Sequence, residues 1–280
     1  MKRIGNLYEK VCSIENLQLA DEKARKGKLR TYGVIEHDKK REVNLLKLRE
    51  TLLNGTFHTS KYDVFTIYEP KEREIYRLPY FPDRILHHAI MNVLEPIWVS
   101  TFTADTYSCI KNRGIHAAAK KVKQALREDP EGTTFCLKLD IRKFYPSINH
   151  DVLKSILRRK LKDKRLLRLL DEIIDSADGV PIGNCLSQYF ANLYLTYFDH
   201  WIKEQKRVKH YFRYADDIVI LASDKSYLHS LMGEIRAYLG DLKLEVKGNW
   251  QVFPVAARGI DFVGYVFFHT HTRMRKGIKK

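Results

Sequence analysis

Residues 137–149 read LKLDIRKFYPSIN, and residues 213–221 read RYADDIVIL. In the first stretch Asp140 directly follows a short apolar run of the kind that forms buried strands. In the second, Asp216 and Asp217 lie at the tip of a tight hairpin with apolar arms. The two stretches therefore predict that acidic side chains from distant parts of the chain lie at the ends of buried strands.

Carboxylates in such positions lose hydration energy unless a cation or a hydrogen-bond donor faces them. Two or three that converge suit Mg²⁺, which prefers hard oxygen ligands and keeps positions open for substrate phosphates. A pair of such ions can hold both the attacking and the leaving oxygen of a phosphoryl transfer. Any one of these residues alone would more often be an ordinary turn aspartate, so the prediction depends on finding them together.

The rest of the chain alternates helical and strand-like patterns without a regular βαβ repeat, which predicts an α+β fold. Residues 152–170 form one predicted amphipathic helix with eight basic side chains and one acid. Further predicted elements are helices at 43–54, 85–98, 115–128, 184–203 and 226–240, and strands at 62–70, 74–82, 242–246 and 262–268. A loop at 179–183 precedes the longest apolar helix.

Composition narrows the class of protein. The chain has 280 residues, 44% of them hydrophobic, which excludes a disordered protein. Fifty Lys and Arg against 34 Asp and Glu leave a net charge of +16, which predicts attraction to a polyanion, either nucleic acid or an anionic membrane. A basic charge that only keeps the protein soluble is the alternative. No apolar run is long enough to span a membrane, and the N-terminus lacks the pattern of a signal peptide. The four cysteines show no metal-ligand spacing, so we expect free thiols and a cytoplasmic protein, with no membrane partner.

Taken in order, these motifs resemble those of reverse transcriptases over about residues 40–265. The stretches at 73–98 and 106–126 resemble the family's two fingers blocks, and LKLDIRKFYPSIN and RYADDIVIL its two metal motifs. LKLEVK and RGIDFVGYVFF are similar to the last two palm blocks. The resemblance implies an RNA-directed DNA polymerase with a right-hand fingers–palm fold, whose palm is a ferredoxin-like antiparallel sheet backed by helices.

The resemblance also implies roles for the motif residues. Asp140 and Asp216 match the two metal ligands, with Asp217 in support and the carbonyl of Ile141 as a main-chain ligand for the two expected Mg²⁺ ions. Tyr145 matches the steric gate against a nucleotide 2′-hydroxyl, or else it is an aromatic core residue.

Three basic residues match nucleotide-binding positions of the family. Arg77 and Arg113 correspond to fingers residues that hold the triphosphate, where a guanidinium can bind phosphate with two hydrogen bonds. Lys247 corresponds to a palm lysine near the leaving pyrophosphate. An exposed surface charge is the alternative interpretation for each of them.

The loop before the longest helix departs from the common pattern of the family. Most reverse transcriptases have a glutamine before the glycine and a proline after the serine, whereas this chain has Ile182-Gly183 and Ser187-Gln188. This combination resembles the enzymes of diversity-generating retroelements, which copy a template-repeat RNA and misincorporate opposite adenines. Loss of one or two hydrogen bonds near the nascent pair is worth about 1–3 kcal/mol of discrimination. Neutral drift in a packing residue is the alternative.

The resemblance predicts four regions: an N-terminal helical extension (1–40), fingers (41–138), palm (139–266) and the start of a short or truncated thumb (267–280). It implies template RNA, a DNA primer or cDNA and deoxynucleotides as partners, with a small basic accessory variability protein, in a bacterial or phage-encoded cytoplasmic system. Alternatives are a retron or group II intron reverse transcriptase of ordinary fidelity, a phage-defence relative, and a simple RNA-binding scaffold.

Overall fold

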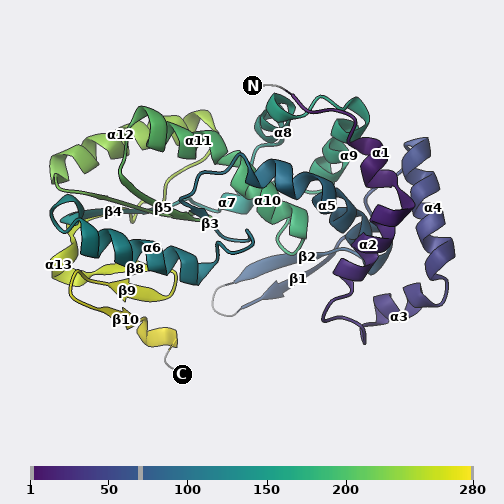
Figure 1. Ribbon diagram of the computed structural model, residues 1–280, viewed down its shortest axis with the longest axis horizontal. Helices are drawn as coiled ribbons and strands as arrows, with labels where there is room; N and C mark the ends of the chain where they lie inside the picture. The colour runs from purple at the N-terminus through teal and green to yellow at the C-terminus, as the bar shows by residue number, and fades with distance from the viewer. Residues whose placement is uncertain (1–2, 69–71, 279–280) are drawn as a thin grey trace. The chain divides into compact units, whose positions relative to one another are not determined.

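The computed structural model describes residues 3–68 and 72–278, and within it the chain forms two compact units. A helical unit takes its residues from 1–100 and 148–194, and a sheet unit takes its residues from 101–147 and 195–280. Each unit is therefore built from two separate stretches of chain (Figure 1). The predicted boundaries of fingers, palm and thumb stay predictions, and the last two residues of the thumb segment lie outside the described residues.

The helical unit contains a bundle of helices and one hairpin of two strands. Its helices are α1 (Tyr8–Cys12), α2 (Ile14–Ala24), α3 (Tyr32–Asp38), α4 (Arg41–Asn54), α5 (Ile85–Val99), α8 (His150–Lys160), α9 (Lys164–Asp175) and α10 (Cys185–Tyr194), with a short helical segment η1 (Tyr80–Arg84) before α5. Its hairpin pairs β1 (Asp63–Ile67) with β2 (Arg73–Arg77) in antiparallel register. Both strands are largely exposed.

The region predicted as one basic helix at 152–170 is two helices. α8 ends at Lys160, and α9 begins at Lys164. Asp163 is the N-cap of α9, and its side chain accepts a hydrogen bond from the backbone N–H of Leu166. An acidic N-cap of this kind satisfies a backbone donor that has no partner within the helix. The prediction of a single helix was wrong because Asp163, the one acid of the stretch, starts a new helix.

The sheet unit is built around a five-stranded sheet in the order β3–β5–β6–β4–β7. Its strands are β3 (Thr106–Tyr107), β4 (Phe135–Asp140), β5 (His210–Tyr214), β6 (Asp217–Ala222) and β7 (Gln251–Pro254). All neighbours are antiparallel except the edge strand β3, which runs parallel to β5. A second sheet contains β8 (Ile260–Phe262), β9 (Tyr265–Phe267) and β10 (Thr272–Met274).

Helices cover both faces of the central sheet (Figure 1). One face carries α6 (Ile115–Glu128) and the second sheet, and the other carries α12 (Lys225–Asp241). The remaining elements are α7 (Phe144–Ser147), α11 (Thr196–His200) and α13 (Val255–Arg258), with short helical segments η2 (Glu131–Thr133), η3 (Trp201–Gln205) and η4 (Lys276–Ile278).

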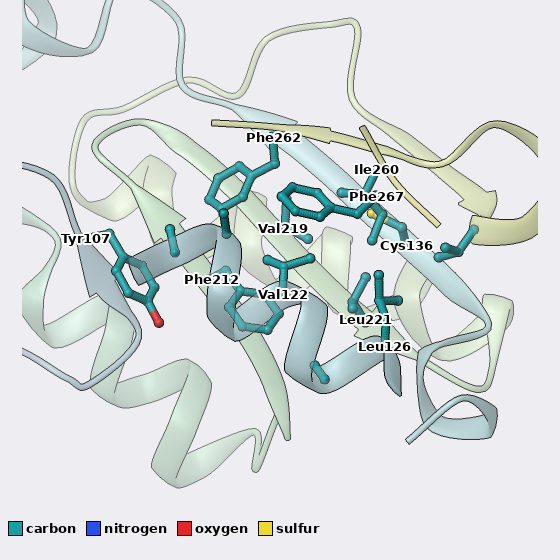
Figure 2. Packing of buried hydrophobic residues seen from close by; sticks show 14 of the residues in the cluster. Tyr107, Val122, Leu126, Cys136, Phe212, Val219, Leu221, Ile260, Phe262 and Phe267 are labelled. Atoms are coloured by element: carbon teal, nitrogen blue, oxygen red, sulfur yellow. The ribbon is translucent and has the colours of Figure 1, made fainter. Parts of the chain in front are cut away.

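The core of this unit lies between α6, the central sheet and the second sheet, as Figure 2 shows. Val122 from α6, Val219 from β6 and Phe262 from β8 are buried in it. Burial of an aliphatic or aromatic side chain of this size contributes about 1.5–3 kcal/mol. This packing fixes the ends of β4 and β6, from which the acidic residues project.

Three predicted strands and one predicted helix differ in the structure. Residues 74–82 form a strand only within β2, because Tyr80–Arg84 form η1, and the helix predicted at 184–203 is divided into α10, α11 and η3. Residues 242–246 form only a bridge between Val246 and Ile141 rather than a strand, and residues 262–268 are divided between β8 and β9. The division follows from backbone conformation, because Val263 and Gly264 both have positive φ and form the turn. Within residues 3–68 and 72–278, no helix combines the length and apolar character that a membrane span requires.

Candidate active site

The three acidic residues lie at one end of the central sheet. Asp140 at the end of β4 is paired in register with Asp217 at the start of β6, so their side chains leave the same face. Asp216 occupies the two-residue turn between β5 and β6, in which Ala215 has a φ of 54°. The hairpin predicted at residues 215–216 is therefore present, and it brings Asp216 and Asp217 to Asp140 across 76 residues of sequence.

Lys247 is attached to Asp140 by both side chain and backbone. Its Nζ lies 2.7 Å from Asp140 Oδ2, and its backbone N–H donates to the Asp140 carbonyl at 2.9 Å. The other oxygen, Asp140 Oδ1, is buried and accepts no hydrogen bond from any described residue. A buried carboxylate oxygen without a donor is costly, and a hard cation is a natural partner for it.

Lys138 neutralises the second acid of the hairpin. It lies two residues before Asp140, on the same face of β4, and its Nζ donates to Asp217 Oδ1. The same ammonium group lies 4.9 Å from the centre of the Phe262 ring. Asp217 is thus engaged by a protein cation, whereas Asp140 Oδ1 is not.

Burial and mutual repulsion dominate the electrostatics of the carboxylates. Burial, together with the charge of Asp140, raises the pKa of Asp216 to about 6. Burial also raises the pKa of Asp217, although the charge of Lys138 opposes the shift. Two carboxylates that resist ionising together are stabilised by a bound divalent cation. The described residues contain no complete cluster of three His, Cys, Asp or Glu ligands, so substrate phosphates or water would have to supply the remaining positions.

Tyr145 lies on α7, just after the β4 carboxylate, and its ring contacts Phe144 edge-on at 5.6 Å. Burial raises the pKa of its phenol, and Cys109 and Asp216 add to the shift. Arg113 donates from Nη1 to the carbonyl of Thr103 at 2.8 Å. The Arg113 guanidinium is therefore partly committed to its own loop.

The other predicted residues belong to the helical unit. Arg77 on β2 forms an ion pair with Asp63 on β1, and its guanidinium lies 5.6 Å from the Phe65 ring centre. The carbonyl of Ile182 accepts a hydrogen bond from the backbone N–H of Tyr76 at 2.9 Å, which ties the loop to β2.

Gly183 has a conformation that other residues rarely adopt. Its φ is 121°, and a Cβ atom there would lie 3.0 Å from the Tyr76 carbonyl oxygen. Ser187 is buried within α10, and Gln188 is exposed. Arg77 and residues 182–188 belong to the helical unit, whereas the three carboxylates belong to the sheet unit.

Three charged residues near the carboxylates were not predicted from the sequence: Lys138, Asp199 and Arg213. The sequence does indicate that Lys138 lies beside Asp140, because residues at positions i and i+2 of a strand share a face. Arg213 is a charged residue inside an apolar strand, which signals a buried partner. That the partner is Asp199, on α11, depends on how the helix packs against the sheet.

Comparisons with known proteins agree with this geometry. The family model described as reverse transcriptase (RNA-dependent DNA polymerase) matches residues 69–267. Protein YkfC of Escherichia coli is 26% identical over 82% of this chain and 73% of its own length. The group II intron-encoded protein LtrA of Lactococcus lactis is 23% identical over 63% of this chain, which matches only 31% of LtrA.

Solved structures give the same fold. Apo telomerase from Candida tropicalis superposes with a TM-score of 0.56 over 78% of this chain and 49% of its own, at 12% identity. Telomerase from Candida albicans, in complex with a fragment of telomeric RNA, has a TM-score of 0.56 over 85% of this chain and 49% of its own, at 13% identity. The likeness confirms the α+β fingers–palm polymerase fold expected for the chain. The chain spans about half the length of these telomerases.

Proposed function

The chain belongs to the reverse transcriptase family, and we propose that it extends a DNA primer with deoxynucleotides on an RNA template. The observation that carries this proposal is the meeting of Asp140 and Asp216 at the end of the central sheet, with the buried Asp140 Oδ1 lacking a donor among the described residues. A simple RNA-binding scaffold would have no use for such a costly pair of carboxylates.

We assign Asp140 and Asp216 to hold Mg²⁺, with the carbonyl of Ile141 as a further ligand and Asp217 in support. Two bound Mg²⁺ ions would activate the primer 3′-hydroxyl and neutralise the charge of the triphosphate. Lys247 orients Asp140 through its 2.7 Å contact and adds positive charge on the side of the leaving pyrophosphate.

The substrate contacts rest on the family's pattern. Tyr145 is assigned as the steric gate, and Arg77 and Arg113 as triphosphate ligands. Phosphate binding by either arginine would compete with the contact that its guanidinium now makes, to Asp63 or to the Thr103 carbonyl.

Primer extension by the purified chain with Mg²⁺ on a defined RNA template tests the proposal. We expect labelled cDNA from the wild type and a loss of at least about 100-fold in Asp140→Asn and Asp216→Asn, because each removes a metal ligand. Asp241→Asn, which changes an exposed carboxylate on α12, is the matched control and should retain full activity. Retained synthesis in either site variant would contradict the assignment.

For the subtype, we propose error-prone copying of a template-repeat RNA, as in diversity-generating retroelements. The support is Ile182 and Gln188, which replace the hydrogen-bonding glutamine and the proline of most family members. The group II intron-encoded relative favours the alternative, a group II intron reverse transcriptase of ordinary fidelity.

Sequencing of the cDNA separates the two subtypes. Substitutions concentrated at template adenines support the first, and a uniformly low error rate supports the second. Ile182→Gln should lower errors at adenines while the loop is kept, because the Ile182 hydrogen bond to Tyr76 is made by the backbone.

The proposed partners are template RNA, the primer and its cDNA, deoxynucleotides and a small basic accessory variability protein, in the cytoplasm of a bacterial or phage-infected cell. The accessory protein is testable in the same assay. If the chain alone gives no product and addition of the basic protein restores synthesis, the partner is established.

A further inference from the structure

A fully buried ion pair lies behind the hairpin turn that carries Asp216. The Arg213 guanidinium on β5 meets the Asp199 carboxylate on α11 with two hydrogen bonds, from Nε to Oδ1 at 2.7 Å and from Nη2 to Oδ2 at 2.6 Å. Both side chains are completely inaccessible to solvent. Two donors complete the shell of Asp199, the Tyr211 hydroxyl at 2.6 Å and the Thr106 hydroxyl at 2.8 Å.

The third nitrogen of this guanidinium reaches the turn itself. Arg213 Nη1 donates to the carbonyl of Ala215 at 3.0 Å. Ala215 is the turn residue with positive φ, and its carbonyl belongs to the peptide group that leads directly into Asp216. A hydrogen bond at this carbonyl therefore constrains the peptide plane from which the Asp216 side chain starts.

The Arg213 side chain lies on the face of the central sheet opposite to the Asp140 and Asp217 side chains. It is paired in register with Ile218, whereas Asp217 is paired with Asp140 and Tyr214. Because side chains alternate along a strand, Arg213 points away from the face that carries Asp140 and Asp217. The guanidinium can thus hold the turn without entering the space where metal and substrate would bind.

Stability alone is a weak explanation for such a pair. Removing two charges from water is expensive, and replacing a buried ion pair by apolar residues of similar size is often neutral or stabilising. A guanidinium, however, has a rigid planar fork that can satisfy a carboxylate with one edge and a carbonyl with the remaining nitrogen. The pair is therefore well suited to fix geometry at the turn.

We infer that Arg213, locked by Asp199, is a positioning residue that orients the Asp216 turn for metal binding. This inference rests on the proposed function, because it assigns Asp216 a divalent cation. In metal sites, residues that orient the ligands typically contribute 10- to 100-fold to metal affinity or activity. The same range is expected here for the loss of the contact between Arg213 and Ala215.

The test replaces the pair without leaving a buried charge. The variant Arg213→Met, Asp199→Leu, Tyr211→Phe removes the ion pair together with the Tyr211 hydroxyl, which would lose its acceptor. The Thr106 hydroxyl also loses Asp199 in this variant, but it keeps the Thr103 hydroxyl as a partner at 3.0 Å. Tyr211→Phe alone is the matched control, since it removes a 2.6 Å hydrogen bond to Asp199 but leaves Arg213 bound to Ala215. Arg213→Lys is a second variant, which keeps the charge opposite Asp199 but loses the fork.

Three measurements are made on each protein: thermal unfolding in EDTA, Mn²⁺ binding followed by electron paramagnetic resonance, and primer extension as a function of Mg²⁺ concentration. We expect the triple variant and Arg213→Lys to fold and to bind Mn²⁺ about 10- to 100-fold more weakly than Tyr211→Phe. Their apparent Mg²⁺ requirement should rise by the same factor. A merely structural pair would change the unfolding temperature but not the Mn²⁺ affinity of the folded protein.

Folded variants with the Mn²⁺ affinity of Tyr211→Phe would overturn the inference. Loss of the folded state in both Arg213 variants would assign the pair to folding and would also overturn it. The Mn²⁺ measurement does not depend on DNA synthesis. A wild type that binds Mn²⁺ but makes no cDNA, either alone or with the basic accessory protein added, would therefore contradict the proposed function while the role of Arg213 is still decided.

Discussion

At the scale of single residues, Asp216 links stability to function. Its folded-state pKa of about 6 exceeds the ordinary aspartate value near 4, because of burial and the charge of Asp140. A raised pKa contributes stability that is fully present below pH 4 and is lost as pH rises through 6. At neutral pH the metal-free protein therefore carries a penalty for keeping this carboxylate ionised.

Asp216→Asn should remove that penalty. With about two pKa units at about 1.4 kcal/mol each, we expect the variant to be more stable than wild type by about 2–3 kcal/mol at pH 7.5 in EDTA. The gain should disappear near pH 4, where the wild-type carboxyl is protonated. Urea unfolding at both pH values measures it, with Asp241→Asn as the control. An equal difference at both pH values would assign the effect to packing.

Lys138→Met is expected to move the acid limb of the pH–rate profile to higher pH. Without the ammonium group, nothing offsets the burial that raises the pKa of Asp217, and the neighbouring carboxylates become harder to ionise together. The profile is measured by primer extension at saturating Mg²⁺. Lys120→Met, which changes an exposed lysine on α6, should leave the profile unchanged. If both variants match wild type, Lys138 has no part in the titration of the site.

At the scale of secondary-structure elements, one carboxylate joins the starts of two helices. Asp163 caps α9 through Leu166 and also accepts hydrogen bonds from the backbone N–H groups of Leu7 and Tyr8 at 2.8 and 2.9 Å, where α1 begins. Burial alone would raise its pKa, but these donors outweigh burial and lower it. Its contribution is therefore present above the ordinary aspartate pKa and is lost as pH falls through the lowered value.

Asp163→Ala should destabilise the protein more than the loss of an ordinary cap. We expect about 2–3 kcal/mol at pH 7, because one cap contributes about 1 kcal/mol and two further backbone donors lose their acceptor. Asp224→Ala removes the single cap of α12 and should cost about 1 kcal/mol. Denaturant unfolding of both variants gives the comparison. Equal losses would show that the bonds to Leu7 and Tyr8 contribute little.

The elements also show how far sequence reasoning reaches. The hairpin at Ala215-Asp216 was predictable because its turn and its alternating apolar arms are local features. The break at Asp163 and the turn at Val263 were not predicted, because each interrupts a pattern that remains periodic on both sides. Among the site residues, Asp140, Asp216 and Asp217 follow from strand ends, and Lys247 from the family's pattern. The pair of Arg213 with Asp199 depends on packing between elements that no local pattern specifies.

At the scale of the whole molecule, the net charge predicts how strongly binding to a polyanion depends on salt. The +16 charge is partly compensated locally, since in the basic stretch at 152–170 Lys154, Arg158 and Arg165 form ion pairs with Asp175, Asp171 and Glu9. The attraction to an RNA–DNA duplex should still be dominated by phosphate contacts, whose strength falls with salt as counterions are released less favourably.

Raising KCl from 50 to 200 mM should therefore weaken duplex binding by about 10- to 1,000-fold. Fluorescence anisotropy with a labelled duplex at several salt concentrations measures the slope of log Kd against log salt. Duplexes of unrelated sequence should give the same slope, because contacts to the backbone carry no sequence information. A flat dependence would show that the excess charge does not contact phosphate.

The interleaving of the two units has a consequence for how the protein is made. On the ribosome, β4 emerges with Asp140 before either of its sheet neighbours, β6 and β7, has been synthesised. The first hundred residues likewise wait for α8, α9 and α10 to complete their unit. Unpaired strand edges in a nascent chain invite association with other chains. No single cut yields two complete units, so chaperone supply and translation speed should influence the yield of active protein.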